Sequence, residues 1–413
     1  MTQNNNAQFS VAVIGGGAAG FFAAIAAARA GANHKVILLE KSRQPLTKVR
    51  ISGGGRCNVT HSCFDPALLI KNYPRGGKAL LGPFHRFQPL NTIEWFQSEG
   101  VVLKTEDDGR MFPVSDDSAT IANCLISAAK KGGVDLRLGC GVEGIAKADQ
   151  SFLLDLEGEK LYCDRLILAA GSSPRAWEWL KTLGHTIVPP VPSLFTFNTP
   201  TSPLLSLAGI SVPQVRAKIQ ETPLEQLGPL LITHWGFSGP AILKLSAWGA
   251  RILQEKQYRA TLLIDWMPEK KHEALKEQLL QIKSGFPARL VANESPAELP
   301  RNLWRALVEK AGIPAETRWS GLASQALQRL IEELKNGHFE IQGKSQYKEE
   351  FVTCGGVDLA EVNFKTMESK ICPHLFFAGE ILDIDGVTGG FNFQNAWTTG
   401  WIAGHASIEN CMK

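Results

Sequence analysis

The 413-residue chain has little excess charge of either sign. It carries 43 lysines and arginines against 40 aspartates and glutamates, a formal net charge of +3 with a sequence pI near 8.3. Nucleic-acid-binding domains are usually strongly basic, so this composition predicts a small-molecule substrate and no nucleic-acid partner. Hydrophobic residues make up 44% and charged residues 20%, as in an ordinary globular protein.

Cysteine patterns for metal or redox chemistry are also missing. The eight cysteines include no C-x-x-C pair and no zinc spacing, so the sequence predicts reduced thiols and no metal site. Five residues separate Cys57 from Cys63, whereas flavin disulfide reductases have four inside their redox pair. Thiol–disulfide exchange is therefore only an alternative.

Targeting and membrane signals are absent from the sequence pattern. The opening MTQNNNAQFS is polar and has no basic n-region. The apolar stretch from Val11 to Gly31 is long enough to cross a membrane, but it contains a glycine triplet and Arg29. We therefore expect a cytoplasmic protein that does not span a membrane.

A dinucleotide-binding fingerprint opens the chain. The strand FSVAVI leads into GGGAAG, an alanine-rich helix and a second strand, KVILLE, which ends in Glu40. Gly15, Gly17 and Gly20 fit G-x-G-x-x-G, which serves a tight turn, close approach to a pyrophosphate and close helix–strand packing. A diphosphate would lie at the helix N-terminus, and Glu40 would accept the ribose hydroxyls. Glu40 would repel a 2′-phosphate, so the site favours FAD or NAD; an ordinary glycine-rich turn is the alternative.

A second glycine loop follows in KVRISGGGRCNVT. Gly53–Gly55 expose backbone N–H groups that can hold a pyrophosphate or a flavin carbonyl. Lys48 and Arg56 add positive charge that suits an anionic reduced flavin. Cys57 and Asn58 would lie beside the ring. A surface loop with two solvated cations is the alternative.

The third feature is LFFAGEILDIDGVTGGFNFQNAWTTGWIAG near the C-terminus. LFFAGE is a short apolar strand that ends in Gly379 and Glu380, where an acidic group can reach a ribityl chain. The helix opened by Gly390, Phe391 and Asn392 would point its N-terminus at the flavin pyrimidine, where negative charge grows on reduction. A helix-capping loop with solvated acids is the alternative.

The order of these features predicts an α/β protein with a discontinuous nucleotide domain. A Rossmann-like FAD-binding domain would comprise residues 1–190 and 350–413. A β-rich inserted domain would comprise 191–267 and 337–349, and a charged, helix-periodic inserted domain 268–336.

Local patterns add smaller expectations. A polar loop is predicted for residues 41–63, a turn for GRMFP and a linker for VPPVPSLFTF. Gly139, Gly141 and Gly144 also fit G-x-G-x-x-G, but a strand-like alternation follows them, so we reject a second fingerprint. Their backbone can still pass close to an adenine.

The motifs together resemble the BaiN/YhiN-like family of NAD(P)/FAD-dependent oxidoreductases, flavoproteins with two dinucleotide-binding domains. VAVIGGGAAG, ISGGGRCNVT, GRMFPVSDDSATIANCL, THWGFSGPAIL and the C-terminal glycine motif carry the resemblance over nearly the whole chain. It implies bound FAD, with NAD(P)H as a candidate transient co-substrate, and leaves the substrate open. Phe391 and Phe393 replace the family's usual Tyr and Leu, which removes a phenol.

The resemblance and the motifs define the residues expected at the cofactor. The family's motifs imply FAD contacts at Gly15, Gly17, Ala19, Glu40, Lys48, Gly54, Arg56, Asn58, Glu380, Gly390 and Asn392. We further expect contacts at Gly20, Lys41, Gly55, Cys57, Val142, Gly171, Gly379, Asp383 and Phe391.

Catalytic residues are harder to predict because the flavin itself carries the hydride chemistry. His234 in THWGFSGPA is the candidate acid or base, and Cys57 is a second catalytic candidate. A histidine that merely bonds a backbone carbonyl is the alternative.

The leading hypothesis is an FAD-dependent oxidoreductase that acts by hydride transfer on a small molecule bound between its domains. The alternatives are a flavin-dependent amine or hydroxy-acid oxidase, a flavin-binding sensor without turnover, and an NAD-dependent dehydrogenase. The substrate, the electron acceptor and the oligomeric state stay open.

Overall fold

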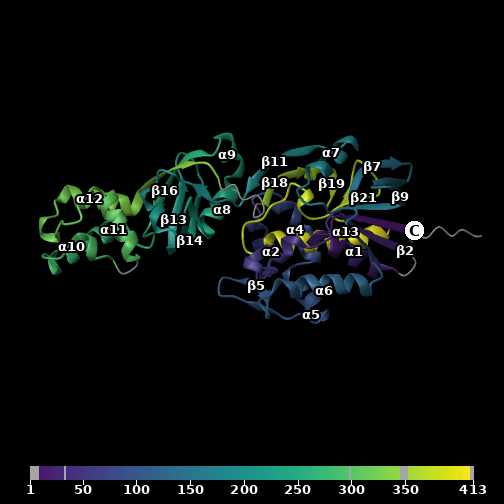
Figure 1. Ribbon diagram of the computed structural model, residues 1–413, viewed down its shortest axis with the longest axis horizontal. Coiled ribbons are helices and arrows are strands. Elements are labelled where there is room, and N and C mark those ends of the chain that lie inside the picture. Colours follow the sequence, from purple (N-terminus) through teal and green to yellow (C-terminus); the bar gives the residue numbers. More distant parts are fainter. Residues whose placement is uncertain (1–8, 32–33, 297–298, 345–351, 410–413) are drawn as a thin grey trace, which may run out of the picture. The chain divides into compact units, whose positions relative to one another are not determined.

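The chain divides into two units. A computed structural model describes residues 9–31, 34–296, 299–344 and 352–409. The first unit comprises Met1–Pro190 and Thr353–Lys413, and the second comprises Val191–Val352. The purple and yellow segments in Figure 1, from the early and the late parts of the described chain, both belong to the first unit, so the second unit is an insertion.

The first unit is built on a mostly parallel sheet. Within the described residues its strand order is β19-β20-β21-β10-β1-β2-β6. The central strands are β1 (Phe9–Ile14), β2 (His34–Glu40), β10 (Arg165–Leu168) and β21 (Leu375–Phe377), and they run parallel. Their continuous apolar sequences fit strands that are covered on both faces. The expected Rossmann-like α/β fold is confirmed.

Two layers cover this sheet. On one face, α1 (Ala18–Ala30) packs against α13 (Phe391–Glu409) and α6 (Ser118–Lys131), and Figure 1 shows α1 and α13 side by side. On the other face lies the three-stranded sheet β7-β8-β9, whose strand β8 (Ser151–Leu156) alternates between half-buried and buried positions. The rest of the unit is formed by α2 (Thr47–Gly55), β3 (Thr60–His61), α3 (Pro66–Leu69), α4 (Gly77–Arg86), α5 (Pro89–Ser98), β4 (Leu103–Thr105), β5 (Arg110–Pro113), β6 (Asp135–Leu138), β7 (Val142–Ala148), β9 (Glu159–Cys163), α7 (Pro174–Thr182), β19 (Val362–Asn363) and β20 (Glu368–Ser369).

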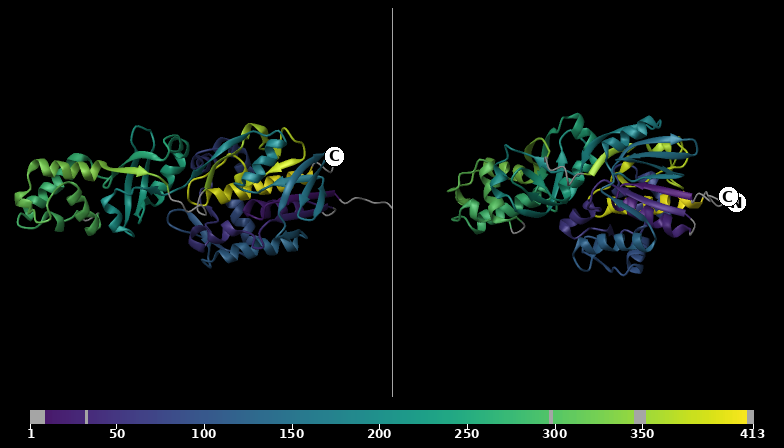
Figure 2. Two further views of the ribbon diagram at one scale, coloured as in Figure 1. Left: turned by 45° about the horizontal axis from the view of Figure 1, so that its top comes forward. Right: turned by 45° about the vertical axis from the view of Figure 1, so that its right-hand side comes forward.

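The second unit combines a six-stranded sheet with helices over one hydrophobic core. The strand order is β12-β15-β14-β13-β16-β17, and each neighbouring pair of these strands is antiparallel. Figures 1 and 2 show α10, α11 and α12 gathered at one end of this unit. The elements are β12 (Phe197–Asn198), β13 (Ser211–Ile219), β14 (Glu225–Ile232), β15 (Gly236–Ser238), α8 (Pro240–Trp248), α9 (Ala250–Glu255), β16 (Arg259–Asp265), α10 (His272–Gly285), α11 (Arg301–Lys310), α12 (Ser324–Asn336) and β17 (Gly337–Gln342).

The chain passes between the units through two strands. β11 (Ile187–Ser193) and β18 (Val352–Val357) form a two-stranded sheet of their own. The predicted proline-rich segment does lead from the first unit into the second, but much of it forms the strand β11. Prolines are tolerated in β11 because a strand with a single neighbour leaves half of its N–H groups outside the ladder.

Two further local expectations were wrong in part. Part of the predicted loop 41–63 is the helix α2, because the Leu46 N–H donates to Gly16 O and Val49 is buried. In the segment GRMFP, predicted as a turn, only Gly109 (φ +83°) has a turn conformation, and Arg110–Pro113 form the strand β5, which pairs with β3 and β4.

The rejection of a second nucleotide fingerprint is confirmed. The strand β7 follows Gly141 and pairs with β8, so no helix N-terminus forms there. In the described part of the chain, no helix is both long and apolar enough to cross a lipid bilayer.

Candidate flavin site

The glycines of the first turn have different surroundings: two are closely packed against backbone atoms, and one faces open space. A Cβ atom on Gly15 would lie 2.4 Å from Ala169 O, and one on Gly20 would lie 1.8 Å from Gly15 O. Gly17, the N-cap of α1, has no atom within 4 Å of such a Cβ, and no side chain caps the helix. The helix N-terminus is therefore open to an anion, as a diphosphate site requires.

Glu40 is held against this turn at the end of β2. Its Oε2 accepts from Gly16 N at 2.6 Å and its Oε1 accepts from Ser42 N at 2.8 Å. A carboxylate has about four acceptor positions, so two are left for ribose hydroxyls. Sequence reasoning overlooked Gly16, although a Cβ there would lie 2.8 Å from Glu40 Cβ.

The segment before β7 lies beside Glu40. Cys140 N donates to Glu40 O at 2.9 Å, and Gly139 N donates to Ser42 O at 3.1 Å. A Cβ on Gly141 would lie 3.7 Å from Lys41 Cβ. These contacts bring Lys41 and the start of β7, where the adenine contact Val142 is expected, next to the ribose end of the site.

The second glycine loop forms an open backbone surface. The regular helix of α2 ends before Ser52, and Gly53, Gly54 and Gly55 follow with φ angles of +58°, +69° and +83°, a left-handed run that glycine adopts readily. No atom lies within 4 Å of a Cβ built on Gly54 or Gly55. The loop is exposed, so its N–H groups are accessible to an electronegative ligand atom.

Arg56 is directed toward an acidic cluster. Its guanidinium lies 4.0 Å from the centre of the Phe112 ring and donates to Glu106 at 2.6 Å. Asp116 is a second partner at 3.4 Å. The hydrogen bond to Glu106 is the main cause of the raised pKa of Arg56. Its charge is therefore already shared with two carboxylates.

The end of β21 reaches the same place from the other end of the chain. A Cβ on Gly379 (φ +74°) would lie 2.8 Å from Ala19 Cβ, and Gly379 N donates to Thr399 Oγ1 at 2.9 Å. Glu380 forms an ion pair with Lys48. A Cβ on Gly171 would lie 3.7 Å from Glu380 Oε2. Residues predicted from four separate segments thus converge around the N-terminus of α1.

Asn58 and Gly390 join the second glycine loop to α13. Asn58 is buried, and with its amide oriented to satisfy both neighbours, Oδ1 accepts from Gly390 N and Nδ2 donates to Thr60 O, both at 3.0 Å. A Cβ on Gly390 (φ +90°) would lie 2.6 Å from Thr60 O. The two predicted contacts therefore also fix the loop that opens α13.

The profile of the HI0933-like protein Rossmann domain matches residues 9–406, almost the whole described chain. The chain belongs to this HI0933-like family. The BaiN/YhiN-like resemblance is thereby confirmed, as is the expected class of enzyme, a flavin-dependent oxidoreductase.

Two curated relatives of the HI0933-like chain cover it nearly end to end. The ribosomal RNA dihydrouridine synthase of Escherichia coli K12 is 32% identical over 408 residues, 95% of this chain and 96% of the relative. The 3-dehydro-bile acid delta(4,6)-reductase of Clostridium scindens is 28% identical, with 97% and 99% covered. Among solved structures, the 3-ketosteroid delta1-dehydrogenase of Sterolibacterium denitrificans is 12% identical with a TM-score of 0.49, covering 96% of this chain and 99% of that one.

Three other expected contacts of the HI0933-like chain have structural partners. The Phe391 ring is buried and stacks on His61 with ring centres 4.8 Å apart. Asn392 Oδ1 accepts from Gly386 N at 2.8 Å, and its Nδ2 donates to Gly386 O at 2.9 Å. Asp383 N donates to Val357 O at 3.1 Å. These residues hold the C-terminal loop in place.

Cys57 is poorly suited to catalysis. It is fully buried, and burial raises the pKa of its thiol to about 12. The thiolate is the reactive form, so this side chain is inert near neutral pH. Cys57 and Cys63 are both free thiols, and the burial of Cys57 argues against the disulfide-exchange alternative.

His234 lies in the other unit, in the turn between β14 and β15. The side chain is exposed, and within the described residues it makes no hydrogen bond or ion pair. It therefore does not serve the structural role that histidines commonly have.

A buried polar network joins α13 to Thr60, the last residue of the second glycine motif. Gln394 Oε1 accepts from Thr60 Oγ1 at 2.6 Å and from Thr92 Oγ1 at 2.9 Å, and its Nε2 donates to Thr398 Oγ1 at 3.0 Å. Sequence reasoning missed these residues. The signal was a pair of polar side chains four apart, Gln394 and Thr398, on one face of α13.

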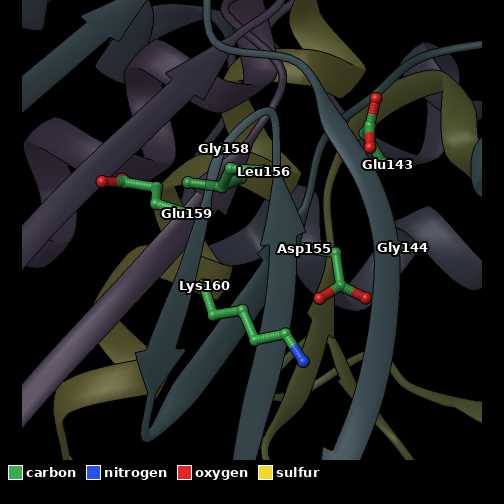
Figure 3. A pocket seen from close by; sticks show the side chains of 7 residues that line it. All are labelled: Glu143, Gly144, Asp155, Leu156, Gly158, Glu159 and Lys160. Atoms are coloured by element: carbon green, nitrogen blue, oxygen red, sulfur yellow. The ribbon is translucent and has the colours of Figure 1, made fainter.

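The hollow in Figure 3 is unsuited to a diphosphate. It lies on the β7-β8-β9 sheet, where Glu143, Asp155 and Glu159 contribute three carboxylates and Lys160 one ammonium group. Across the described ranges, no three His, Cys, Asp or Glu side chains gather as metal ligands. By contrast, the open N–H groups near Gly17 and Gly54 and the anchored Glu40 fit a dinucleotide.

Proposed function

We propose that this protein is an FAD-dependent reductase that adds hydrogen across a carbon–carbon double bond conjugated to a carbonyl, with NAD(P)H as reductant. The observation that carries the proposal is the near-complete match to two relatives whose names describe one kind of chemistry. Dihydrouridine is uridine with its ring double bond reduced, and that bond is conjugated to the C4 carbonyl. A 3-dehydro-Δ4,6 bile acid likewise carries double bonds conjugated to a 3-keto group.

The residues around α1 support FAD as the cofactor. The α1 N-terminus at Gly17 would hold the diphosphate, and Glu40 would hold the adenosine ribose. Lys48, Glu380 and the glycine loop would hold the ribityl chain and the ring. When bound, FAD would accept a hydride from NAD(P)H and deliver it to the substrate.

Two groups of the chain are proposed to serve the reduction step. The α13 N-terminus, with its glycine loop held by Asn58, would favour negative charge on the pyrimidine side of the ring. His234, whose imidazole makes no hydrogen bond within the described residues, is the proposed proton donor to the substrate.

The conjugated carbonyl substrate has two candidate sources, a free small molecule and an RNA. The balanced charge of the chain favours a free small molecule. The name of the 32% identical relative brings in uridine within ribosomal RNA as a second source. Both sources present a carbon–carbon double bond conjugated to a carbonyl, so one site chemistry serves either.

An anaerobic titration tests the reductant and the cofactor together. Purified protein is expected to be yellow and to bleach rapidly when NADPH or NADH is added. A yellow protein that does not bleach would favour the oxidase alternative, and amine and hydroxy-acid donors would then be tested. A colourless protein that binds NAD tightly would favour the dehydrogenase alternative.

Reoxidation of the bleached protein tests the substrate class. We expect a 3-keto-4-ene steroid or a uridine-containing ribosomal RNA fragment to restore the yellow band without oxygen and to yield the saturated product by mass spectrometry. A saturated ketone of the same skeleton is the matched control and should restore nothing. Recovery with the saturated ketone or with neither acceptor would contradict the proposal.

A further inference from the structure

A buried phenol lies against the first turn of α13, within the first unit. Tyr73 is 3% exposed, and its ring meets the ring of Phe391 edge-on with the ring centres 6.2 Å apart. Its Oη donates to Phe391 O at 2.6 Å, a buried hydrogen bond between residues 318 positions apart. A carbonyl oxygen can only accept, so the direction of this bond is fixed. The phenol therefore donates to the first residue of α13.

The chain on either side of Tyr73 is tied to the loop that precedes α13. Val387 N donates to Asn72 O at 2.8 Å. Arg75 donates from two nitrogens to the two carboxylate oxygens of Asp385, whose side chain is fully buried. Such a two-pronged ion pair fixes orientation as well as distance. These contacts hold the phenol in one place relative to the start of α13.

The hydroxyl group of Tyr73 is a permanent donor. Burial raises the pKa of Tyr73 well above its ordinary value of 10.0, so the phenol keeps its proton near neutral pH. A Cβ on Gly386 would lie 2.9 Å from Phe391 Cβ and 3.2 Å from Tyr73 Cε1, so the loop lies directly against both rings. Water is therefore kept away from the hydrogen bond, which strengthens it electrostatically.

The bond acts on the peptide group that joins Phe391 to Asn392. A hydrogen bond to a carbonyl oxygen polarises its peptide group, which makes the N–H on the other side a stronger donor. That N–H belongs to Asn392, in the first turn of α13, where N–H groups have no acceptor within the helix. This first turn is the part of α13 proposed to favour negative charge on the flavin pyrimidine. The phenol thus strengthens the donor end of the helix.

We propose that Tyr73 is a positioning residue that raises the reduction potential of bound FAD through the first peptide group of α13, an inference that rests on the proposed function. Reduction adds negative charge to the pyrimidine, so a stronger donor end stabilises reduced FAD more than oxidised FAD. Tyr73 acts through Phe391 and Asn392, and it sets how completely NAD(P)H reduces the flavin.

The test uses the full-length, FAD-loaded protein, reduced photochemically without oxygen beside a reference dye. The ratio of reduced to oxidised flavin at a fixed state of the dye reports the potential without NAD(P)H or substrate. Tyr73→Phe removes only the hydroxyl group, and replacement of Tyr73 by 3-fluorotyrosine gives a more acidic phenol and so a stronger donor. The matched control is Tyr162→Phe, which removes a hydroxyl from a tyrosine of the same unit that is 62% exposed.

We expect Tyr73→Phe to lower the ratio of reduced to oxidised flavin about 2- to 10-fold, the range produced by losing one neutral hydrogen bond. The 3-fluorotyrosine protein should shift the ratio the opposite way, and Tyr162→Phe should match the wild type. By linkage, the Kd of reduced FAD should rise more than the Kd of oxidised FAD, by the same factor. A phenol that only stabilises the fold would weaken both forms equally and leave the ratio unchanged.

An unchanged ratio in Tyr73→Phe would overturn the inference, as would equal shifts in Tyr73→Phe and Tyr162→Phe. If the ratio shifts as expected but NAD(P)H never bleaches the protein, the proposed reductase fails and the role of Tyr73 stands. If conjugated carbonyl acceptors are reduced and Tyr73→Phe leaves the ratio unchanged, the role of Tyr73 fails and the proposed function stands. A protein that binds no FAD would overturn both.

Discussion

The glycines at the turn before α1 serve three purposes: close packing, an open approach to the helix end, and a hydrogen bond to Glu40. Gly15 and Gly20 lie too close to backbone oxygens for any side chain, whereas Gly17 faces open space. Gly16 donates to the Glu40 carboxylate. The turn is therefore pre-organised around Glu40.

Replacing Glu40 tests this organisation. Glu40→Ala removes the acceptor for Gly16 and Ser42 and for the proposed ribose hydroxyls. Because hydrogen bonds to a charged group contribute about 1.5–3 kcal/mol, the Kd for FAD should rise about 10- to 100-fold. Fluorescence titration of the apoprotein measures it. Glu157→Ala, on the exposed turn before β9, is the control, and an unchanged Kd in Glu40→Ala would refute the ribose assignment.

The burial of Cys57 leads to a prediction about how fast its thiol is alkylated. With a pKa of about 12, its thiolate fraction at pH 8 is about one in ten thousand, against about one in ten for an ordinary thiol with a pKa of 9.0. Iodoacetamide at pH 8 should therefore label the half-exposed Cys63 and spare Cys57 until the protein is unfolded. Peptide mass spectrometry reads this out. Rapid labelling of native Cys57 would restore it as a catalytic candidate.

At the scale of elements, the contact between α1 and α13 depends on two glycines. A Cβ on Gly400 would lie 2.6 Å from Ala19 O, and one on Gly404 would lie 2.4 Å from Ala23 O. The backbone of α1 therefore packs directly against the backbone of α13 at these two glycines. The helix that carries the proposed diphosphate site is positioned by α13.

Adding a methyl group should separate these helices. Gly404→Ala is expected to lower the free energy of unfolding by about 1–3 kcal/mol, since overpacking forces the backbone to move. Urea unfolding measures it. Gly82→Ala is the control, because it lies in α4 with open space around its Cβ position, and alanine there should be neutral or stabilising. Equal destabilisation of both variants would show that the contact does not matter.

A cluster of hydrogen bonds joins the residues just before β11 to the segment after β18. Glu361 accepts from Thr186 N at 3.0 Å and from His185 Nδ1 at 2.8 Å, and His185 Nε2 lies 3.0 Å from Ser369 Oγ. Ser369 Oγ also accepts from Ile371 N and Cys372 N, so its hydroxyl proton goes to His185 Nε2. This fixes the tautomer in which Nδ1–H donates to Glu361.

The pH dependence of this contact has a defined sign. Burial opposes ionisation of Glu361, but the hydrogen bonds from Thr186 and His185 outweigh it and hold the pKa of Glu361 below its ordinary 4.5. The stability that it contributes is therefore present above pH 4.5 and is lost as the pH falls through the lowered value.

Glu361→Gln should reduce the free energy of unfolding at pH 7 by about 1–3 kcal/mol. The difference from the wild type should shrink as the pH is lowered below 4.5. Urea unfolding across this range measures it, with the exposed Glu178→Gln as control. A difference that grows toward acid would reverse the assigned sign.

Much of the first unit could be predicted from the sequence because its signals are local. The order strand, glycine turn, helix and strand ending in Glu40 is readable within one stretch of chain. The helix over Thr47–Ile51 could not be predicted in this way. Its start depends on the hydrogen bond from Leu46 N to Gly16 O, which joins residues far apart in the sequence. The ion pairs of Arg56 were likewise not predictable, since its partners Glu106 and Asp116 are remote in sequence.

At the scale of the whole molecule, the sheet and the helices of the second unit share their interior. Leu279 of α10, Trp304 of α11 and Leu330 of α12 lie in the same hydrophobic core as Phe237 and Ile264 of the sheet. Their separate helical periodicity suggested a module of its own. Removing residues 269–336 alone would open this core, so a deletion must take the whole insertion.

The shared core predicts that residues 191–352 fold when expressed alone. We expect cooperative thermal unfolding, dispersed amide signals by NMR and no bound flavin. The complementary protein, residues 1–190 joined to 353–413 by a short glycine–serine linker, should retain FAD. Flavin in the isolated insertion, or none in the joined protein, would contradict the division of the chain.

The dependence of α1 on α13 has a consequence for how the protein is made. The glycine turn at Gly15 emerges from the ribosome long before Gly379, Gly390 and the helix that packs against Ala19. We therefore expect nascent chains to retain no flavin until α13 has been made, although domains usually fold from the N-terminus onward. Premature termination anywhere upstream of α13 should leave a colourless product, which makes flavin retention a readout of translation through α13.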